Sequence, residues 1–449
     1  MKDFNMTEGS LFKKILLFSL PLMLSQVLQV FFNMADVAVV GKFASSKALG
    51  SVGSTTILVM LFTGFLIGLG SGVNVIVAKH LGAKDVQKTK HVIHTSFLIC
   101  LIAGVIIALL CLVLASPMLS LINTKEDLMD GAVLYFRIYA LGMPALAIFN
   151  YGNGVLSANG DTKRPLIYLT ISGILNIIFN LFFVIVCKMA ADGVALSSII
   201  SQYISAFLII WHMIHDKGIC NFNIKTVKIY PNCSKDILII GLSAGMQNAI
   251  FAIANLFIQV GINSFDSTVV SGNSAATNAD TLVYNVMAAF YTACSTFMGQ
   301  NLGAGNKKRV LHSYLISLTY SFLTGAILGS LLLIFGNEFL SLFANDADVI
   351  KAGMEKLQIM GFSFCVSAFM DCTIAASRGI GKSLIPTIIV IIGSCVFRVV
   401  WVYTIFAYFK TIPSLYLLYI FSWGITGICE IIYFVISYRK LTHTQVTTA

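Results

Sequence analysis

The pentapeptide LGAKD at residues 81–85 returns as LGAGN at residues 302–306, an offset of 221 residues. The same offset carries Pro165 onto Pro386, with no insertion between these points. The units of a solenoid repeat every ~20–50 residues, so a period of this length indicates a duplicated half-protein instead. In membrane proteins, duplicated halves are typical of transporters whose binding site lies between the copies.

The composition predicts an all-α polytopic membrane protein. Hydrophobic residues make up 57% of the 449 residues and charged residues only 11%, whereas soluble domains carry about 25% charged residues. A helix that spans a bilayer needs ~20 mostly apolar residues. We predict 12 transmembrane helices, at residues 15–40, 51–78, 92–116, 131–158, 165–187, 192–214, 237–263, 281–303, 310–335, 353–377, 384–409 and 414–438.

The loops between these spans differ in basic residues, and this difference predicts the orientation. Of the 29 Lys and Arg residues, 20 lie in one set of loops and termini, 7 lie in the opposite set, and Arg137 and Arg398 lie within spans. Loops rich in Lys and Arg stay in the cytoplasm, so we predict that both termini are cytoplasmic. The basic residues that give the net charge of +10 lie in short loops between spans. We therefore expect no nucleic acid partner.

Each half of the chain holds an even number of spans, so both halves begin on the same side of the membrane. Halves with the same topology are related by a pseudo-twofold axis along the membrane normal. We predict an N-terminal six-helix lobe at residues 1–214, a polar cytoplasmic linker at 215–236 and a C-terminal six-helix lobe at 237–449.

Motifs for enzyme chemistry are not found. The sequence contains no Walker A motif, no His-Glu-x-x-His and no Gly-x-Ser-x-Gly. The ten cysteines lie mostly in apolar runs without metal-ligand spacing, as small core residues do. Glycines 64, 68, 70 and 72 lie within one span, which predicts close helix packing rather than a nucleotide loop. We expect neither an enzyme nor a bound cofactor.

Asp36 lies fifteen residues beyond Pro21 in the first span, about 22 Å further along a helix. This distance places Asp36 in the outer half of the bilayer. A carboxylate there must face protein or a water-filled cavity. Gln26, Gln29 and Asn33 precede it at helical spacing and predict a polar stripe that lines a cavity. Pro21 removes one helical hydrogen bond and is a candidate hinge. The alternative for Pro21 is a static kink. The alternative for Asp36 is a carboxylate at the membrane interface or one that makes a structural hydrogen bond.

Asn176 and Asn180 stand four residues apart in the fifth span and present two amides on one helix face. With Ser198 of the next span they form a candidate oxygen-rich site around Asp36. Oxygen ligands suit hard cations such as Na⁺, and a buried carboxylate can carry a proton. The alternative is ordinary hydrogen bonding between helices.

The second half has ionisable residues of its own. Asp371 and Arg398 lie within spans and have no charged counterpart in the first half. Asp371 is a functional candidate, and the alternative is a structural interaction with Arg398 or with a hydroxyl group. Arg137 and Glu430 lie near span ends, where we expect them to extend toward the interface.

The sequence resembles the multidrug and toxic compound extrusion (MATE) family over nearly its whole length. The stretch DVAVVG at 36–41 is similar to the end of that family's first helix. Residues 82–85 and 303–306 resemble its loops after helices two and eight, and residues 160–165 and 378–383 resemble its loops after helices four and ten. The resemblance implies two six-helix lobes around a central cavity. It also implies export of organic compounds, often amphipathic cations, in exchange for Na⁺ or H⁺.

By this resemblance, Asp36 is the coupling carboxylate of the N-terminal lobe, and Asn176, Asn180 and Ser198 take the accompanying polar positions. Many relatives carry an acid where Asn180 stands, so the coupling ion is left open between Na⁺ and H⁺.

In the C-terminal lobe, Asp371 falls on a helix-ten carboxylate of some bacterial branches. Those branches often pair it with an acid in helix seven, and here the nearest residues are Asn255 and Gln259. We regard these two residues and Arg398 as candidates for the lining of the cavity.

We therefore predict a secondary active multidrug antiporter, a monomer in the bacterial plasma membrane. The alternative within the same superfamily is a flippase for lipids or lipid-linked oligosaccharides, which usually has extra spans or a strongly cationic cavity. An alternative of another class, a polytopic membrane enzyme, would need catalytic residues clustered at one membrane face, and the sequence suggests none.

Overall fold

The computed structural model describes residues 4–443 of the chain. These residues form helices and connecting turns, with no β-strand among them. The all-α fold predicted from the composition is therefore confirmed. The two termini, for which we predict a cytoplasmic position, lie outside the described residues together with Lys2.

Contacts divide the chain into two compact units. Unit 1 contains Val27–Ala249 together with Phe4, and unit 2 contains Asn5–Gln26 together with residues 250–443. Each unit thus consists of most of one half of the sequence and a short segment of the other. The helices α1 (Leu11–Phe43) and α8 (Pro231–Ile262) each contribute one part to each unit.

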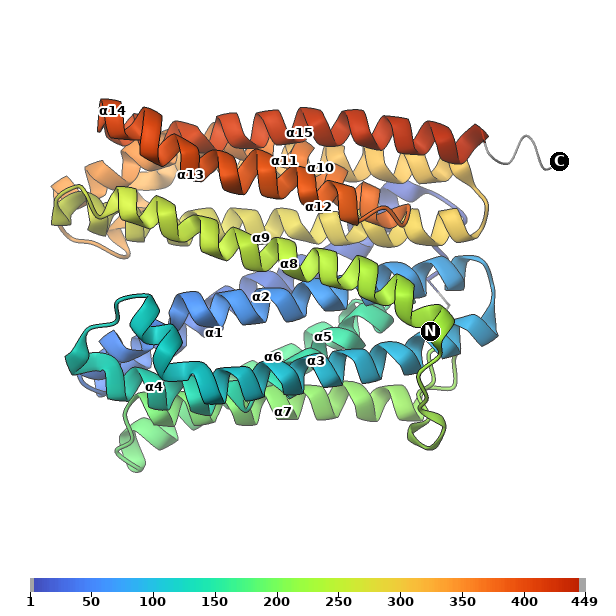
Figure 1. Ribbon diagram of the computed structural model, residues 1–449, viewed down its shortest axis with the longest axis horizontal. Coiled ribbons are helices and arrows are strands. Elements are labelled where there is room, and N and C mark those ends of the chain that lie inside the picture. The colour runs from blue at the N-terminus through green and yellow to red at the C-terminus, as the bar shows by residue number, and fades with distance from the viewer. Residues whose placement is uncertain (1–3, 444–449) are drawn as a thin grey trace. The chain divides into compact units, whose positions relative to one another are not determined.

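The rest of unit 1 is a bundle of long apolar helices (Figure 1). Its helices are α2 (Ser46–Gly82), α3 (Val86–Leu121), α4 (Glu126–Ala140), α5 (Met143–Ala158), α6 (Lys163–Leu181) and α7 (Ala191–His215), with a π-helical segment η1 (Phe182–Val186) and a 3₁₀ turn η2 (Ile224–Thr226). The segment 215–236 is anchored to this bundle, because Phe222 is buried against the rings of Phe97 and Tyr151.

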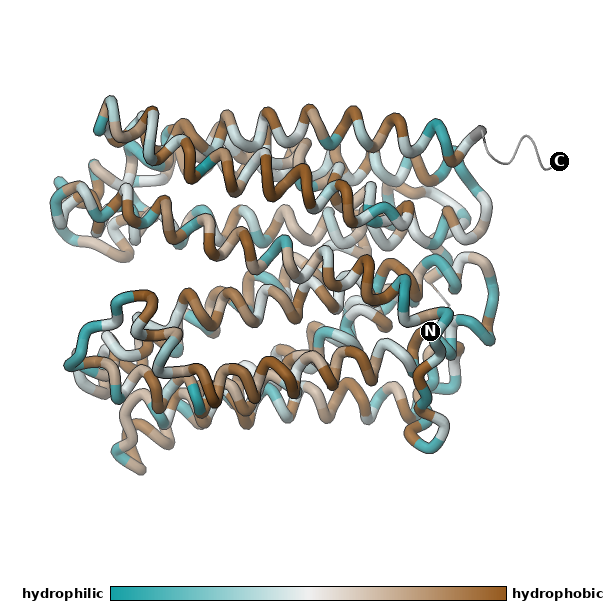
Figure 2. Tube along the Cα trace, viewed as in Figure 1, coloured by the Kyte–Doolittle hydropathy of each residue, from teal (hydrophilic) through white to brown (hydrophobic). Residues whose placement is uncertain are grey.

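Unit 2 has the same kind of helical bundle. Its helices are α9 (Ser267–Gly303), α10 (Lys307–Ser341), α11 (Ala347–Gly379), α12 (Leu384–Val390), α13 (Phe397–Trp401), α14 (Ala407–Phe409) and α15 (Ile412–His443). The π-helical segments η3 (Ile391–Val396) and η4 (Val402–Phe406) join α12, α13 and α14 into one continuous rod. Figure 2 shows that hydrophobic residues predominate along the helices of each unit and that hydrophilic residues gather at the loops.

The duplication predicted from the sequence is confirmed by the helix boundaries. The helices α2 and α9 begin and end 221 residues apart, and the starts of α3 and α10 differ by the same number. The caps repeat as well, because the side chains of Asp85 and Asn306 accept hydrogen bonds from the third residue of the helix that follows. At Asp85 the Lys88 N–H donates over 3.0 Å, which lowers the pKa of that carboxyl group.

The helices account for the 12 predicted spans. Ten helices are long and apolar enough to cross a bilayer, and the bent pair of α4 and α5 makes an eleventh span. The remaining predicted span, 281–303, lies in α9, whose first turns are rich in Ser, Asn and Thr. The helix α9 begins at Ser267, before the predicted span, because its polar first turns are helical too. Only the apolar part of the helix was predicted as a span.

One predicted span is broken in the structure. We expected a continuous helix over 131–158, but α4 ends at Ala140 and α5 begins at Met143, with a bend of 44° between them. Pro144 stands in the first turn of α5, where its missing N–H and fixed φ favour a new helix start. The corresponding helix α11 carries Cys365 at this position and is unbroken.

The glycines of α2 do pack closely against another helix, as their position within a span predicts. A Cβ added at Gly72 would lie 2.5 Å from the Gly241 Cα, and one at Gly68 would lie 2.5 Å from the Gly245 nitrogen. These four residues let the backbones of α2 and α8 approach each other within unit 1. A real Cβ does not reach such distances, so any side chain here would push the helices apart.

We expect Gly72→Ala to lower the free energy of unfolding by about 1–3 kcal/mol, the usual cost of overpacking. The matched control is Gly53→Ala on the same helix, where an added Cβ meets nothing within 4 Å. That control should be neutral or up to ~1 kcal/mol more stable, because alanine favours a helix over glycine. Unfolding of the purified protein in mixed micelles, followed by circular dichroism, measures both. Equal stability of the two variants would contradict the close-packing argument.

Candidate functional site

The candidate site in unit 1 is built on Asp36 of α1. Its Oδ1 accepts a hydrogen bond from the Asn180 amide nitrogen Nδ2 over 2.5 Å. The same Nδ2 donates to the Asn176 Oδ1 over 3.3 Å. Asn176 and Asn180 are buried, so the structure brings together three of the predicted site residues at one point of α1 and α6.

The local sequence of α6 explains this arrangement. Asn176 and Asn180 are one helical turn apart, so both amides project from the same face, as predicted. The π-helical segment η1 begins two residues after Asn180. Such π segments often occur at functional sites, since they change the direction in which the helix presents its side chains.

The Asn180 carbonyl oxygen Oδ1 is an unusual atom in this site. It is buried and has no hydrogen-bond partner among the described residues. An unsatisfied buried polar atom costs about 1–3 kcal/mol. The site therefore has an unused acceptor beside a carboxylate.

Two tyrosines that we did not select from the sequence also belong to this site. Tyr135 and Tyr139 of α4 pack in one hydrophobic cluster with Val39 and Val40, which lie about one turn beyond Asp36 on α1. Their signal in the sequence is the spacing of four residues, which places both phenols on one helix face. Ser198 is buried on α7, but within the described chain no hydrogen bond joins it to Asp36, Asn176 or Asn180.

The other predicted residues of α1 lie before Asp36. Pro21 and Gln26 belong to the part of α1 in unit 2, whereas Gln29 and Asn33 belong to unit 1. Asn33 is exposed, and Gln26 and Gln29 are half-buried. The carbonyl oxygen of Pro21 accepts a hydrogen bond from the Ser25 Oγ over 3.0 Å. The hinge at Pro21 and the cavity-lining stripe stay predictions.

In unit 2, Asp371 is buried in α11 and receives hydrogen bonds from neighbouring hydroxyl groups. Ser367 Oγ donates to its Oδ2 over 2.8 Å, and the Tyr284 hydroxyl donates to its Oδ1 over 3.5 Å. No ion pair joins Asp371 to Arg398 in the described part of the chain. Of the structural alternatives, the pair with Arg398 is therefore not present among the described residues, whereas the interaction with hydroxyl groups is.

Arg398 is instead surrounded by aromatic rings. Its guanidinium carbon lies 4.8 Å from the ring centre of Tyr419, 5.4 Å from that of Phe251 and 5.7 Å from that of Trp423. Its Nη1 donates to the Asn255 Oδ1 over 3.3 Å. Cation–π contacts of this kind stabilise a desolvated cation. Of the other candidates, Asn255 is exposed, and the Gln259 amide donates to the Asn263 Oδ1 over 2.8 Å.

The expectation for Glu430 was wrong. We expected this carboxylate to extend from a span end toward the interface, but it is 0% exposed. It lies thirteen residues before the end of α15 and packs inside unit 2, so its side chain is too deep to reach the helix end. Arg137 is exposed, and its Nε donates to the Leu112 carbonyl oxygen over 3.1 Å.

Unit 2 also contains an ion pair that the sequence analysis missed. Lys356 Nζ of α11 lies 2.9 Å from the Asp280 Oδ2 of α9, and their side chains are 5% and 15% exposed. The same Nζ donates to the Thr277 hydroxyl over 2.8 Å. Asp280 lies one residue before the predicted span 281–303, and Lys356 lies three residues inside the predicted span 353–377. Asp280 proves to be helical because α9 begins at Ser267, fourteen residues before that predicted span.

The position in unit 2 that corresponds to the Asp36 site is apolar. Ile258 and Trp401 stand where Asp36 and Asn180 stand in the first half, and they pack together in a hydrophobic cluster with Phe406 and Leu415. The repeated helices therefore carry a polar site in unit 1 and a hydrophobic contact in unit 2.

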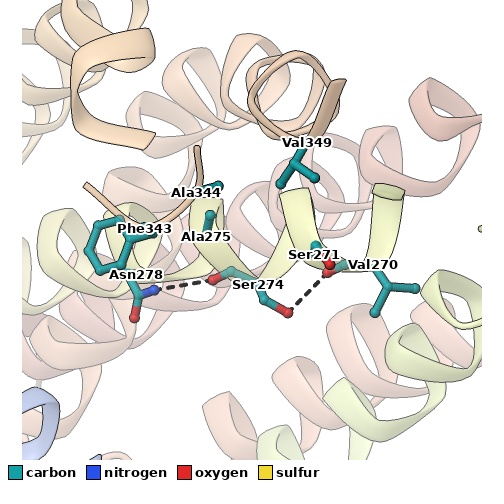
Figure 3. A pocket seen from close by; sticks show the side chains of 8 residues that line it. All are labelled: Val270, Ser271, Ser274, Ala275, Asn278, Phe343, Ala344 and Val349. Carbon is teal, nitrogen blue, oxygen red and sulfur yellow. Dashed lines mark hydrogen bonds between the residues drawn. The ribbon is translucent and has the colours of Figure 1, made fainter. Parts of the chain in front are cut away.

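A shallow pocket of about 360 Å³ lies at one end of α9 (Figure 3). Ser271, Ser274 and Asn278 line it together with Phe343. The Asn278 amide donates to the Ser274 carbonyl oxygen over 3.2 Å, and the Ser274 Oγ donates to the Val270 carbonyl oxygen over 3.0 Å. Both bonds run to backbone carbonyl oxygens of α9, and no predicted site residue lines the pocket.

No group of three or more His, Cys, Asp or Glu side chains that could hold a metal ion occurs among residues 4–443. The Asp36 site offers one carboxylate and two amide groups. Their oxygen atoms are ligands of the kind that hard cations prefer.

Long apolar helices, a duplicated half and isolated buried charges together define a polytopic membrane transporter. The chain belongs to the MatE family of multidrug efflux transporters, whose profile matches it twice, at residues 21–182 and 244–404. Transporters of this family handle small organic substrates within the membrane and need no cofactor. Their structures have 12 helices in two lobes.

Two relatives and one solved structure illustrate the similarity. The probable multidrug resistance protein YpnP of Bacillus subtilis (strain 168) is 28% identical over 366 residues, 81% of this chain and 81% of that protein. The FAD transporter of Shewanella oneidensis is 24% identical over 361 residues, 78% of each chain. The outward-facing structure of a multidrug resistance MATE family transporter of the MOP superfamily matches with a TM-score of 0.91 at 21% identity. It covers 98% of this chain and 99% of that one.

We expect Asn180→Ala to lower the free energy of unfolding by about 1.5–3 kcal/mol, because it removes a hydrogen bond to a charged group. The control Ser198→Ala, which removes no such bond, should cost less than about 1 kcal/mol. A double-mutant cycle with Asp36→Ala tests the pair, since the effect of Asn180→Ala should largely vanish in that background. The same loss in both backgrounds would show that the contact contributes nothing.

We expect Asp280→Asn to destabilise unit 2 by about 3–5 kcal/mol, because it leaves the buried Lys356 charge without its counterion. Replacing both partners, Asp280→Leu with Lys356→Met, should restore stability to near the wild-type value. Thermal unfolding of the purified protein in detergent measures both. If the single variant were as stable as the double variant, the ion pair would not be structurally important.

Proposed function

We propose that this protein is a secondary active multidrug antiporter that exports organic, cationic amphipathic compounds in exchange for Na⁺ or H⁺. The observation that carries the proposal is the Asp36 carboxylate, which is held by Asn180 within otherwise apolar helices. A charged group at this depth is rarely retained without a function. Membership of the MatE family supports the same reading.

The Asn180 amide provides a simple way to sense the charge of Asp36. With Nδ2 toward Asp36, as observed, the amide donates to the carboxyl group, an arrangement that suits its ionised form. With the amide turned over, Oδ1 would accept from a protonated carboxyl group or ligate Na⁺ beside it. The buried Oδ1 without a partner is the atom that this rotation would satisfy. Ion binding at Asp36 would therefore change the hydrogen bonding of α6 next to its π segment.

The charge of the substrate decides which gradient drives export. Exchange of one monovalent organic cation for one H⁺ or Na⁺ moves no net charge across the membrane. The membrane potential, worth about 2.3 kcal/mol per elementary charge at 100 mV, would then do no work. Export would depend on the chemical gradient of the coupling ion alone.

The remaining features of the proposal concern the arrangement in the cell. We propose a monomer in the bacterial plasma membrane with both termini in the cytoplasm. Residues 1–214 and 237–449 would act as the two lobes, joined by the linker 215–236. The proposal involves no enzymatic activity, no bound cofactor and no nucleic acid.

We expect Asp36→Asn to reduce ion-driven efflux of a cationic dye from proteoliposomes at least about tenfold, that is ~1.4 kcal/mol. Asparagine keeps the size of the side chain but cannot take up a proton or hold a cation by charge. The control is Asp127→Asn, since Asp127 is exposed in the first turn of α4. Wild-type efflux by Asp36→Asn would remove Asp36 from the coupling mechanism.

The same vesicles separate the remaining possibilities. Gradients of Na⁺, of H⁺ and of electrical potential are imposed one at a time, and the gradient that drives dye efflux identifies the coupling ion. Because one relative is named as an FAD transporter, vesicles loaded with FAD are tested in parallel. Transport of FAD without transport of the dye would replace the proposal of cationic substrates.

A further inference from the structure

Arg398 of α13 is a buried cation without a carboxylate partner. It is 2% exposed, and none of the ion pairs among residues 4–443 includes it. The oxygens of Asp371, the acid that the sequence offered as its partner, accept hydrogen bonds from Ser367 and Tyr284 instead. A buried charge without a counterion is strongly destabilising. An ionisable residue of this kind within a span therefore indicates a binding function.

The depth of Arg398 separates it from the headgroups of the lipids. Its span runs from Leu384 to Phe409, so Arg398 lies fourteen residues after the start of the span and eleven before its end. These separations correspond to about 21 Å and about 16 Å along a helix. The hydrocarbon core of a bilayer is about 30 Å thick, so the anion that would compensate Arg398 is not a lipid headgroup.

Three aromatic rings surround the guanidinium group. Its carbon lies between 4.8 Å and 5.7 Å from the ring centres of Tyr419, Phe251 and Trp423. Rings at this distance attract a cation through their faces. They do not accept its N–H groups as a carboxylate does, so they hold the charge in place without neutralising it.

Most of the hydrogen-bonding capacity of the guanidinium group is unused. Nη1 donates to the Asn255 Oδ1 over 3.3 Å, and Nε donates to the Ser422 Oγ over 3.5 Å. A guanidinium group has five N–H groups, so the other three, both of those on Nη2 among them, have no acceptor in the part of the chain that the structure describes. Adjacent N–H groups of this planar fork match the two oxygens of a carboxylate or phosphate group.

The helix around Arg398 is wound differently from its copy in the first half. The single turn α13 lies between the π-helical segments η3 and η4. The corresponding residue Ile177 lies in α6, which is α-helical throughout from Lys163 to Leu181, so η3 has no counterpart there. Segments of π-helix often occur at functional sites, and this additional one directly precedes the turn that carries the buried cation.

The residues around the guanidinium group also differ from those of the first half. Gln29, Ser198 and Gln202 stand at the positions that correspond to Phe251, Tyr419 and Trp423. The cation and all three rings are therefore specific to unit 2. A set of four matched substitutions is not required by the common scaffold, which the first half builds without them.

The surroundings of Arg398 reach the surface of unit 2. Asn255 is exposed, and Phe251 and Tyr419 are half-buried, although each of them contacts the buried guanidinium group. A ligand that enters beside Asn255 can place an acidic group on the guanidinium group. An aromatic ring of the same ligand can then pack against the half-buried rings, edge to face or offset.

We propose that Arg398 binds the carboxylate or phosphate group of an aromatic compound, so that aromatic anions are a second class of ligand for this protein. The acidic group would supply the missing counterion and accept from the unused N–H groups. The aromatic rings keep the cation in place while the site is empty. This inference goes beyond the proposed export of cations, and it does not depend on ion coupling at Asp36.

Binding to the purified full-length protein in detergent, followed by isothermal titration calorimetry, tests the proposal. The probes are naphthoate and naphthyl phosphate, with the uncharged naphthamide as the matched control for the acidic group. We expect the two anions to bind to the wild type more tightly than naphthamide. Arg398→Gln should weaken binding of the anions about tenfold or more, because hydrogen bonds to a charged group are lost.

Two further variants control for charge and folding. Arg137→Gln removes an exposed arginine of α4 and should bind the anions as the wild type does. Arg398→Lys keeps the charge but loses the planar fork, so it should also bind them more weakly, and it decides the question if Arg398→Gln does not fold.

Three results would overturn the proposal: no binding of the anions by the wild type, equal binding of the anions and naphthamide, or undiminished binding by the Arg398 variants. Asp36→Asn should lose ion-driven efflux of the cationic dye and still bind naphthoate as the wild type does. The failure of one proposal can therefore be told apart from the failure of the other.

Discussion

A charged side chain in the interior of a bilayer must be met by protein groups or lose its charge. Both units contain such side chains, and each side chain is stabilised by a different kind of contact. Asp36 accepts a hydrogen bond from an amide, Lys356 pairs with Asp280, and Arg398 lies against aromatic rings. Each solution ties two or three helices together at a given depth, so the ionisable groups contribute to the architecture as well as to the chemistry.

The duplicated halves keep their turns and caps while their interiors differ. Helix boundaries coincide under a constant offset, and the turns after α2 and α9 both contain a residue with positive φ, Lys84 at 56° and Gly305 at 72°. The π-helical segments η1 and η4 occur at matching positions as well. In contrast, Asp36 and Asn180 of the first half correspond to the apolar residues Ile258 and Trp401 of the second half. Duplication thus provided a common scaffold, and substitutions of single side chains made the two interiors chemically unequal.

Much of the fold follows from patterns that are local in sequence. Apolar length, the offset of the repeat and the four-residue spacing of Asn176 and Asn180 each need only the helical period, and these predictions agree with the structure. The errors arose where neighbouring helices decide. Glu430 lies near the end of its predicted span in sequence, but it is buried in unit 2. Asp280 and Lys356 are 76 residues apart in the sequence, and the polar first turns of α9 placed Asp280 outside the predicted span. The break before Pro144 depends on a single proline that its repeat lacks.

The division of α1 between the two units also has a consequence for synthesis in the cell. The first half of this helix is made at the very beginning, yet its packing partners in unit 2 come much later. Phe18 meets the ring of Phe297, and the Met6 carbonyl oxygen accepts from Asn301. At ~5–20 residues per second, these partners leave the ribosome tens of seconds after α1. During that interval the apolar start of the chain has lipid or the insertion machinery as its surroundings, and unit 1 closes with the start of α8 before unit 2 can form.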